Sequence, residues 1–415
     1  MRKLVISILV AAMLAAMLAG GCSKPAPSPA PTPTPAPALP KTLDIGVAVV
    51  LTGVTAHIGT NIQNAILMAI DDRNEQGGAT IAGQKYVLNP IVRDTKQDII
   101  AAKSIAEELV FDKGVKVISG PFIADAVGVQ SVTEPNKVML FGISVVVPAM
   151  IGPNKPYTFF SGRPKRQMLN NPCAYIQKFY PEAKTVISLI PDISDLPTFT
   201  DAAETMCQRY GLDWQGYEKM PIDTKDFMPI ISRVLPKNPD IIDTSSTGGA
   251  MGAMCALLVK QLRQAGFNGI IMIPAVPPPG LIEEVVPKEY LTKVVTNDLN
   301  PDGPVVTQAY RDICNGYEKK FGQVPVDIVA WVYNCQSAFY KFLDGQTTMD
   351  TTAWMEGFEK YRWQGPFGFE SFWIGKPIWG IDRCLLGPAW TSEYKNGKLV
   401  TEWAAPLPYD MFVEK

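Results

Sequence analysis

The chain has 415 residues, of which 47% are hydrophobic and 19% are charged, and its formal net charge is −2. This length allows a large apolar core and about two domains of ordinary size. No basic cluster stands out, which argues against a nucleic-acid partner. The only histidine is His57, so we expect no metal site, no histidine-based catalytic relay and no cofactor.

The N-terminal segment has the three parts of an export signal. Met1-Arg2-Lys3 is positively charged, residues 4–18 are almost wholly apolar, and Ala19-Gly20-Gly21 supplies small residues just before Cys22. The apolar run is shorter than the roughly 20 residues that cross a bilayer. We therefore predict a signal peptide over residues 1–21.

Cys22 resembles the lipidated cysteine of bacterial lipoproteins, although Ala19 stands where an aliphatic residue is usual. An ordinary secretory signal is the alternative. Residues 22–41 contain proline at nearly every second position, which favours an extended polyproline spacer. The sequence thus predicts a lipid-anchored, Pro-rich tether that holds an extracytoplasmic protein at the outer face of the cytoplasmic membrane or in the periplasm.

Strands and helices alternate from residue 43 onward. In the first half, apolar runs predict strands at 43–51, 86–93, 115–118 and 138–144, and helical periodicity predicts helices at 61–73, 99–109 and 125–134. The pattern restarts with strands at 185–190, 240–244 and 270–273 and helices at 199–210, 227–235 and 251–265. Two further helices are predicted at 305–321 and 327–342. This alternation is typical of βαβ units, so we predict an α/β protein with two doubly wound parallel sheets.

The cysteines and the tryptophans are each compatible with two interpretations. Six cysteines follow Cys22, and none lies in a CxxC pair or at zinc spacing: Cys173, Cys207, Cys255, Cys314, Cys335 and Cys384. A bridge between Cys314 and Cys335 and a set of buried free thiols are both compatible with the sequence. Six tryptophans between 354 and 403 could form a carbohydrate platform, but large core residues are the favoured interpretation.

Five short segments in a fixed order carry a family resemblance: Leu43 to Gly53, Arg93-Asp94-Thr95, Gly114 to Pro121, Asp223 to Ile231 and Asn238 to Ile242. Across roughly residues 43–390 the chain resembles the substrate-binding proteins of branched-chain amino-acid-type ABC transporters, which are type I periplasmic binding proteins. The resemblance implies two α/β lobes joined by three hinge crossings, with a ligand between them. It implies an N-terminal lobe of residues 42–161 and 297–344, and a C-terminal lobe of 162–296 and 345–415.

The resemblance also implies where a ligand is held. The matching first-lobe positions are Phe122, Ile123, Ala124, Ser144 and Val145. The matching second-lobe positions are Asp195, Leu196, Ser246 and Thr247, and Ala275 and Val276 stand where an acid usually neutralises a ligand ammonium. His57, in the first strand–helix loop, and Arg163, at the first crossing, are further candidates. A surface-loop histidine and a solvated or hinge-holding arginine are their alternatives.

These residues indicate the chemistry of the ligand. An unpaired ammonium buried in an apolar cleft costs several kcal/mol. We therefore predict a small, largely apolar or aromatic organic acid, delivered to an ABC permease and its ATPase. A true branched-chain amino-acid binder and a ligand-sensing lobe for a membrane signalling partner remain alternatives.

An enzyme is the other class considered. The first strand–helix turn, residues 52–59, lacks the G-x-G-x-x-G spacing of a dinucleotide site. Residues 142–146 do not match G-x-S-x-G, and no histidine follows them. No phosphate loop or HExxH motif occurs. The sequence therefore predicts a binding protein and no catalysis.

Overall fold

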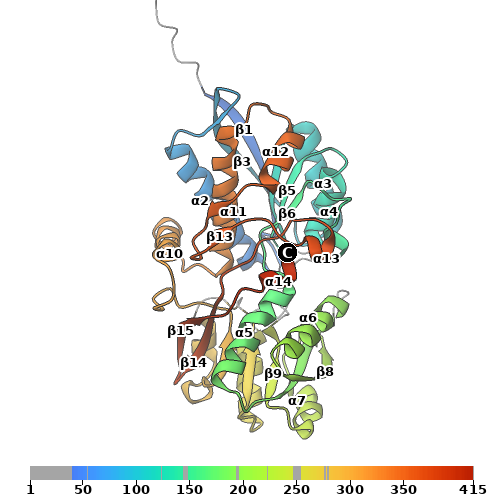
Figure 1. Cartoon of the computed structure of the whole chain (residues 1–415), viewed down its shortest axis with the longest axis vertical. Helices are drawn as coiled ribbons and strands as arrows, with labels where there is room; N and C mark the ends of the chain where they lie inside the picture. The colour runs from blue at the N-terminus through green and yellow to red at the C-terminus, as the bar shows by residue number, and fades with distance from the viewer. Residues whose placement is uncertain are drawn as a thin grey trace, which may run out of the picture. The chain divides into compact units, whose positions relative to one another are not determined.

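Two mainly parallel sheets with helices on both faces make up the computed structural model (Figure 1). It describes residues 40–53, 55–122, 124–143, 148–192, 196–221, 223–245, 254–274, 277 and 280–414. Pro40 onward forms one compact unit. The predicted signal peptide, Cys22 and nearly all of the tether lie outside the described residues. Among the helices described, none is both long and apolar enough to cross a membrane.

The first sheet has six strands in the order β2-β3-β1-β4-β5-β6. Their bounds are β1 Lys41–Val49, β2 Ala79–Ile81, β3 Gln84–Asp94, β4 Val117–Phe122, β5 Met139–Ile143 and β6 Thr158–Phe160. All pairs are parallel except β2 with β3. The second half of β1 is buried throughout, as expected for a parallel strand whose two faces are both covered.

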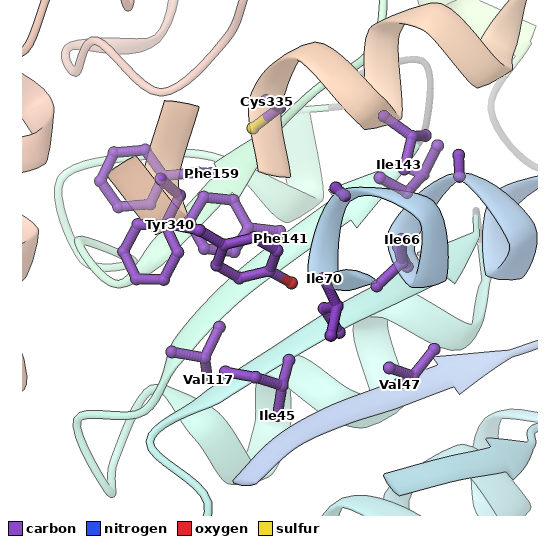
Figure 2. Close-up of a cluster of buried hydrophobic side chains, with 14 of the residues drawn as sticks. Ile45, Val47, Ile66, Ile70, Val117, Phe141, Ile143, Phe159, Cys335 and Tyr340 are labelled. Carbon is purple, nitrogen blue, oxygen red and sulfur yellow. The ribbon is translucent and has the colours of Figure 1, made fainter. Parts of the chain in front are cut away.

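Helices cover the two faces of this sheet. Helices α2 (Ala56–Glu75) and α11 (Ile328–Phe342) lie side by side on one face, and α3 (Ile99–Glu107) and α4 (Ala124–Thr133) lie on the other (Figure 1). A π-helical turn, Glu108–Asp112, extends α3. Figure 2 shows the core beneath α2 and α11, with the rings of Phe141, Phe159 and Tyr340 gathered together and Ile66 and Ile70 contributed by α2.

The second sheet has seven strands in the order β15-β14-β11-β10-β9-β7-β8. Their bounds are β7 Thr185–Pro191, β8 Asp213–Met220, β9 Ile241–Asp243, β10 Ile270–Ile273, β11 Val294–Thr296, β14 Trp390–Lys395 and β15 Lys398–Ala404. The first five in chain order are parallel, and the hairpin β14–β15 adds an antiparallel edge. Helices α5 (Lys165–Phe179) and α6 (Leu196–Arg209) cover one face, and α7 (Met228–Val234), α8 (Met254–Gln264) and α9 (Leu281–Val285) cover the other.

The remaining helices and strands complete the unit. These are α10 (Gln308–Phe321), α12 (Thr351–Glu359), α13 (Lys376–Trp379), α14 (Tyr409–Phe412) and the hairpin of β12 (Trp363–Gln364) with β13 (Glu370–Ser371). Single 3-10 turns lie at Pro148–Met150, Leu235–Lys237, Lys288–Tyr290 and Leu343–Gly345. The six described cysteines are all buried free thiols, so Cys314 and Cys335 do not pair.

The predicted fold class, two doubly wound parallel sheets, is confirmed. In each half the parallel strands follow the doubly wound order, with the second strand outside the first and the third on the other side. Among the elements that the sequence did not predict are α5, α12, β2, β6, β8 and β11.

The position of helix α12 differs from the predicted lobe boundaries. The sequence assigned residues 345–415 to the second lobe, but Trp354 and Phe358 of α12 are fully buried in the core of the first sheet. The ring of Phe358 lies 5.2 Å from that of Phe339 and 5.8 Å from that of Phe141. The hairpin β14–β15 does pack on the second sheet, through Tyr394.

Replacing Phe358 with alanine tests this packing. Because the side chain is fully buried among aromatic rings, Phe358→Ala should lower the free energy of unfolding by about 3–5 kcal/mol. Phe111→Ala is the matched control, since Phe111 is 63% exposed and its truncation should change stability by no more than about 0.5 kcal/mol. Urea unfolding measures both, and equal losses would contradict the assignment of α12 to this core.

Candidate functional site

Each sheet has one point where the strand order reverses, and ligands of open parallel sheets bind beyond the carboxyl ends of the strands there. In the first sheet the reversal lies between β1 and β4, and in the second it lies between β7 and β9. The loops that follow these four strands therefore define the candidate site.

Four of the ligand-binding residues predicted from the sequence lie near these strand ends and among the residues that the structure describes. His57 is in the first turn of α2, half-buried, with Nε2 buried and without a hydrogen-bond partner. Phe122 ends β4 and is 7% exposed as part of the first core. Ala124 begins α4, and Leu196 begins α6. All four lie at the expected edge, and their contacts with a ligand stay predictions.

The remaining candidates, apart from Arg163, lie outside the described residues. They are Ile123, Ser144, Val145, Asp195, Ser246, Thr247, Ala275 and Val276. Their proposed roles stay predictions as well.

The chain passes between the two sheets three times, after β6, after β11 and before β14. Buried amide side chains tie these crossings together. Gln167 donates to the carbonyl of Gly387 at 2.8 Å and accepts from its amide at 2.9 Å. Asn171 donates to Pro388 O at 3.0 Å, and Asn297 donates to Met168 O at 2.8 Å. The first crossing is thus bonded to each of the other two.

Arg163 lies at the first crossing and is 1% exposed. Its Nη2 is 3.4 Å from Asp327 Oδ2 at the start of α11, and its guanidinium lies 4.4 Å from the ring centroid of Trp331. None of its three side-chain nitrogens makes a hydrogen bond. Burial lowers the pKa of Arg163 and raises that of Asp327 to about 7. Arg163 therefore joins the first crossing to the first lobe through charge and ring stacking.

Gly387 leaves no room beside Arg163. A Cβ atom on Gly387 would lie 2.6 Å from Arg163 Cγ and 2.8 Å from Nε. The third crossing can therefore approach the first this closely only because residue 387 has no side chain.

This contact generates a mutational test. We expect Gly387→Ala to cost about 1–3 kcal/mol, because the buried arginine has to move. Gly316→Ala, in the exposed part of α10 with no atom within 4 Å of its Cβ, should instead gain up to about 1 kcal/mol. Denaturant unfolding measures the stability of both variants. An unchanged free energy of unfolding in Gly387→Ala would show that the crossings are loosely packed.

A cavity of about 300 Å³ lies between the first turns of α5 and α6 and the segment that contains α13 and α14. Its walls combine apolar groups, two cations, one carboxylate and one hydroxyl group: Pro164, Lys165, Arg166, Pro197, Thr198, Asp201, Ala202, Ile378, Trp379 and Phe412. Lys165 is 5% exposed and its Nζ lies over the ring of Phe199. Arg166 pairs with Asp201 at 3.0 Å. We call this space the anion cavity.

The electrostatics of the anion cavity follow from its two helices. The amino-terminal ends of α5 and α6 both border it, and each carries a partial positive charge. No side chain caps α5, and α5 begins with Lys165 and Arg166. Carboxylates favour such ends, and Trp379, Ile378 and Phe412 provide an apolar wall. The arrangement suits a small anion with an apolar body.

From the sequence, Lys165 and Arg166 were not singled out, and Trp379 was expected to be a core residue. Trp354, Trp373 and Trp390 are indeed 0–3% exposed, but Trp379 lines the anion cavity. Phe412 was not singled out, because it reaches the cavity only through the fold of the C-terminal segment. Among the described residues, no group of three or more His, Cys, Asp or Glu side chains could hold a metal ion.

Comparison with known proteins agrees with this architecture. A family model described as "Periplasmic binding protein" matches residues 42–377. A LivJ substrate-binding protein from Streptococcus pneumoniae, in complex with isoleucine, is 17% identical with a TM-score of 0.71, over 88% of this chain and 100% of that one. A leucine-binding LivK from Thermotoga maritima is 16% identical with a TM-score of 0.69, over 88% and 99%.

A solute-binding protein of an ABC transporter from Rhodopseudomonas palustris BisB5, in complex with 3,4-dihydroxybenzoic acid, is 19% identical. Its TM-score is 0.67, over 88% of this chain and 98% of that one. At these identities the likeness is one of fold.

Proposed function

Because the chain belongs to the periplasmic binding protein family, we propose that it is an extracytoplasmic solute-binding lipoprotein that captures a small, largely apolar organic acid between its lobes. It would deliver this solute to an ABC permease and its ATPase, and Cys22 would anchor it to the membrane. The family is one of binding rather than catalysis.

The observation that carries the proposal is the anion cavity. The amino termini of α5 and α6 favour a carboxylate, Lys165 and the Arg166–Asp201 pair border the cavity, and Trp379 and Phe412 offer apolar contact to the rest of the solute. Its volume of about 300 Å³ is at the lower end of the range for small-molecule sites. The solute is therefore expected to be about the size of a single aromatic ring with its substituents.

The structural neighbours support the same chemical class. One holds isoleucine and another holds 3,4-dihydroxybenzoic acid, and both compounds join a carboxylate to a compact body. Because one structural neighbour is an isoleucine complex, the binding of a branched-chain amino acid is the second candidate function.

Capture would use the three crossings. Since Gln167, Asn171 and Asn297 fix the crossings to one another, lobe closure would come from backbone rotation in the few residues next to them. A solute that contacts both sides of the cleft favours the closed arrangement. His57, Phe122, Leu196 and the predicted residues of the strand-end loops would then contribute contacts.

A thermal-shift series tests the proposed solute class. Benzoate and 3,4-dihydroxybenzoate should raise the melting temperature, because a ligand at 100 times its Kd stabilises the folded chain by about 2.7 kcal/mol. Trp379→Ala should abolish most of this shift, whereas Phe111→Ala, an aromatic truncation at an exposed site, should retain it. Stabilisation by leucine, isoleucine or valine and none by the aromatic acids would contradict the solute class and leave the family membership standing.

A further inference from the structure

Two of the six described cysteines share one apolar core. Cys173 of α5 and Cys207 of α6 both lie in the core between these helices and the second sheet, and they are 0% and 1% exposed. The other four described cysteines lie one each in four different cores: Cys255, Cys314, Cys335 and Cys384. Among the described cysteines, Cys173 and Cys207 are therefore the pair that the fold brings together.

The register of α5 and α6 places these two cysteines opposite each other. The helices pack against each other, and their first turns both border the anion cavity, so they run in the same direction. In those first turns the Nζ of Lys165 lies over the ring of Phe199. Cys173 follows Lys165 by eight residues, and Cys207 follows Phe199 by eight residues. In parallel helices, equal steps from a contacting pair lead to a second contacting pair.

The two side chains interact in the structure. A hydrogen bond with the Cys207 side chain is the largest of the effects that raise the pKa of Cys173, ahead of burial. Ala202 and Ala203 of α6 are buried in the same core, and their small side chains allow the helices to approach each other closely. A disulfide requires two cysteines whose side chains point toward each other. The pair meets this requirement.

We propose that Cys173 and Cys207 form a disulfide that joins α5 to α6 beneath the anion cavity. The bridge rests on the extracytoplasmic location proposed above, because disulfides form and persist in oxidising compartments. The oxidant would be a second disulfide, either of a protein or of a small thiol such as glutathione.

Thiol–disulfide exchange gives a balanced reaction. The thiolate of one cysteine attacks a sulfur atom of the oxidant, which breaks the oxidant's S–S bond and releases its first thiol. The thiolate of the other cysteine then attacks the mixed disulfide, forms the Cys173–Cys207 bond and releases the second thiol. The chain loses two electrons and two protons, and the oxidant gains them.

Burial determines when this exchange occurs. The thiolate is the reactive form of cysteine. In the folded chain the raised pKa of Cys173 keeps it a thiol, and its full burial keeps the oxidant away. The bridge therefore forms while the chain folds, before α6 covers α5. Once formed, it restricts the unfolded chain by closing the loop of residues 173–207.

Peptide mapping by mass spectrometry tests the pairing without any substitution. The full chain is reduced, unfolded and refolded with oxidised glutathione, and it is then unfolded again and alkylated with iodoacetamide before digestion. The peptides that contain Cys173 and Cys207 should appear as one linked species that a reducing agent separates. The other four described cysteines should be alkylated.

Melting temperatures measure the effect of the bridge. In the unchanged chain, refolding with dithiothreitol in place of oxidised glutathione should lower the melting temperature by several degrees. Cys207→Ala cannot form the bridge and should melt at the same temperature in both conditions. Cys255→Ala is the matched control, because Cys255 is equally buried in another core and the proposed pair stays intact. Each variant is compared with itself, so the packing cost of its substitution cancels.

Three results would overturn the proposal. They are alkylation of both Cys173 and Cys207 after refolding with oxidised glutathione, a link from either of them to another cysteine, and an equal effect of dithiothreitol on Cys207→Ala. The mapping does not depend on where the protein resides, and the aromatic-acid thermal shift is measured separately on the reduced chain. Failure of the bridge and failure of the proposed function are therefore distinguishable.

Discussion

The structure depends on buried polar contacts between the three crossings. Where the chain passes from one sheet to the other, Gln167, Asn171 and Asn297 replace the apolar side chains that fill the sheets' cores. A buried amide or carbonyl left without its partner costs about 1–3 kcal/mol. In the proposed capture, the crossings keep one arrangement and the two lobes reorient by rotation in the residues next to them.

The position of Arg163 depends on the same close packing of the crossings. The absence of a side chain at Gly387 brings the third crossing against the arginine, and the arginine meets Asp327 and Trp331 of the first lobe. Charge is thus concentrated at the junction of the lobes. The anion cavity borders Pro164 and Lys165, the next residues along the chain. Under the proposed function, the polar groups that recognise the solute would lie beside this junction.

The sheets could be predicted from sequence because their strands are covered on both faces. The run from Leu43 onward is nearly continuous in apolar residues, and burial of β1 confirms that pattern. Helix α5 could not be predicted in the same way. Its buried face contains Gln167, Asn170 and Asn171, and Pro172 lies inside it, so neither apolar periodicity nor composition indicates a helix. Strand β8 alternates between exposed and half-buried residues and lies at the sheet edge, which weakens its signal.

The site was harder to predict than the fold, because its polar partners are distant in sequence. The sequence indicated that no acid stands at residues 275–276, but it gave no sign that Asp298 and Asp327 lie close to Arg163, more than 130 residues earlier. Likewise, Lys165 and Trp379 share one cavity only because the C-terminal segment returns to α6, where Arg209 pairs with Asp410. Spacing along the chain predicts neighbours within a strand or helix, whereas these contacts depend on the completed topology.

The central claim is that the two lobes close about the fixed crossings upon an acidic solute. Small-angle scattering of the chain, free and saturated with the acid that stabilises it most, measures this directly. The account predicts a smaller radius of gyration in the saturated sample. An unchanged radius of gyration at proven saturation would contradict it.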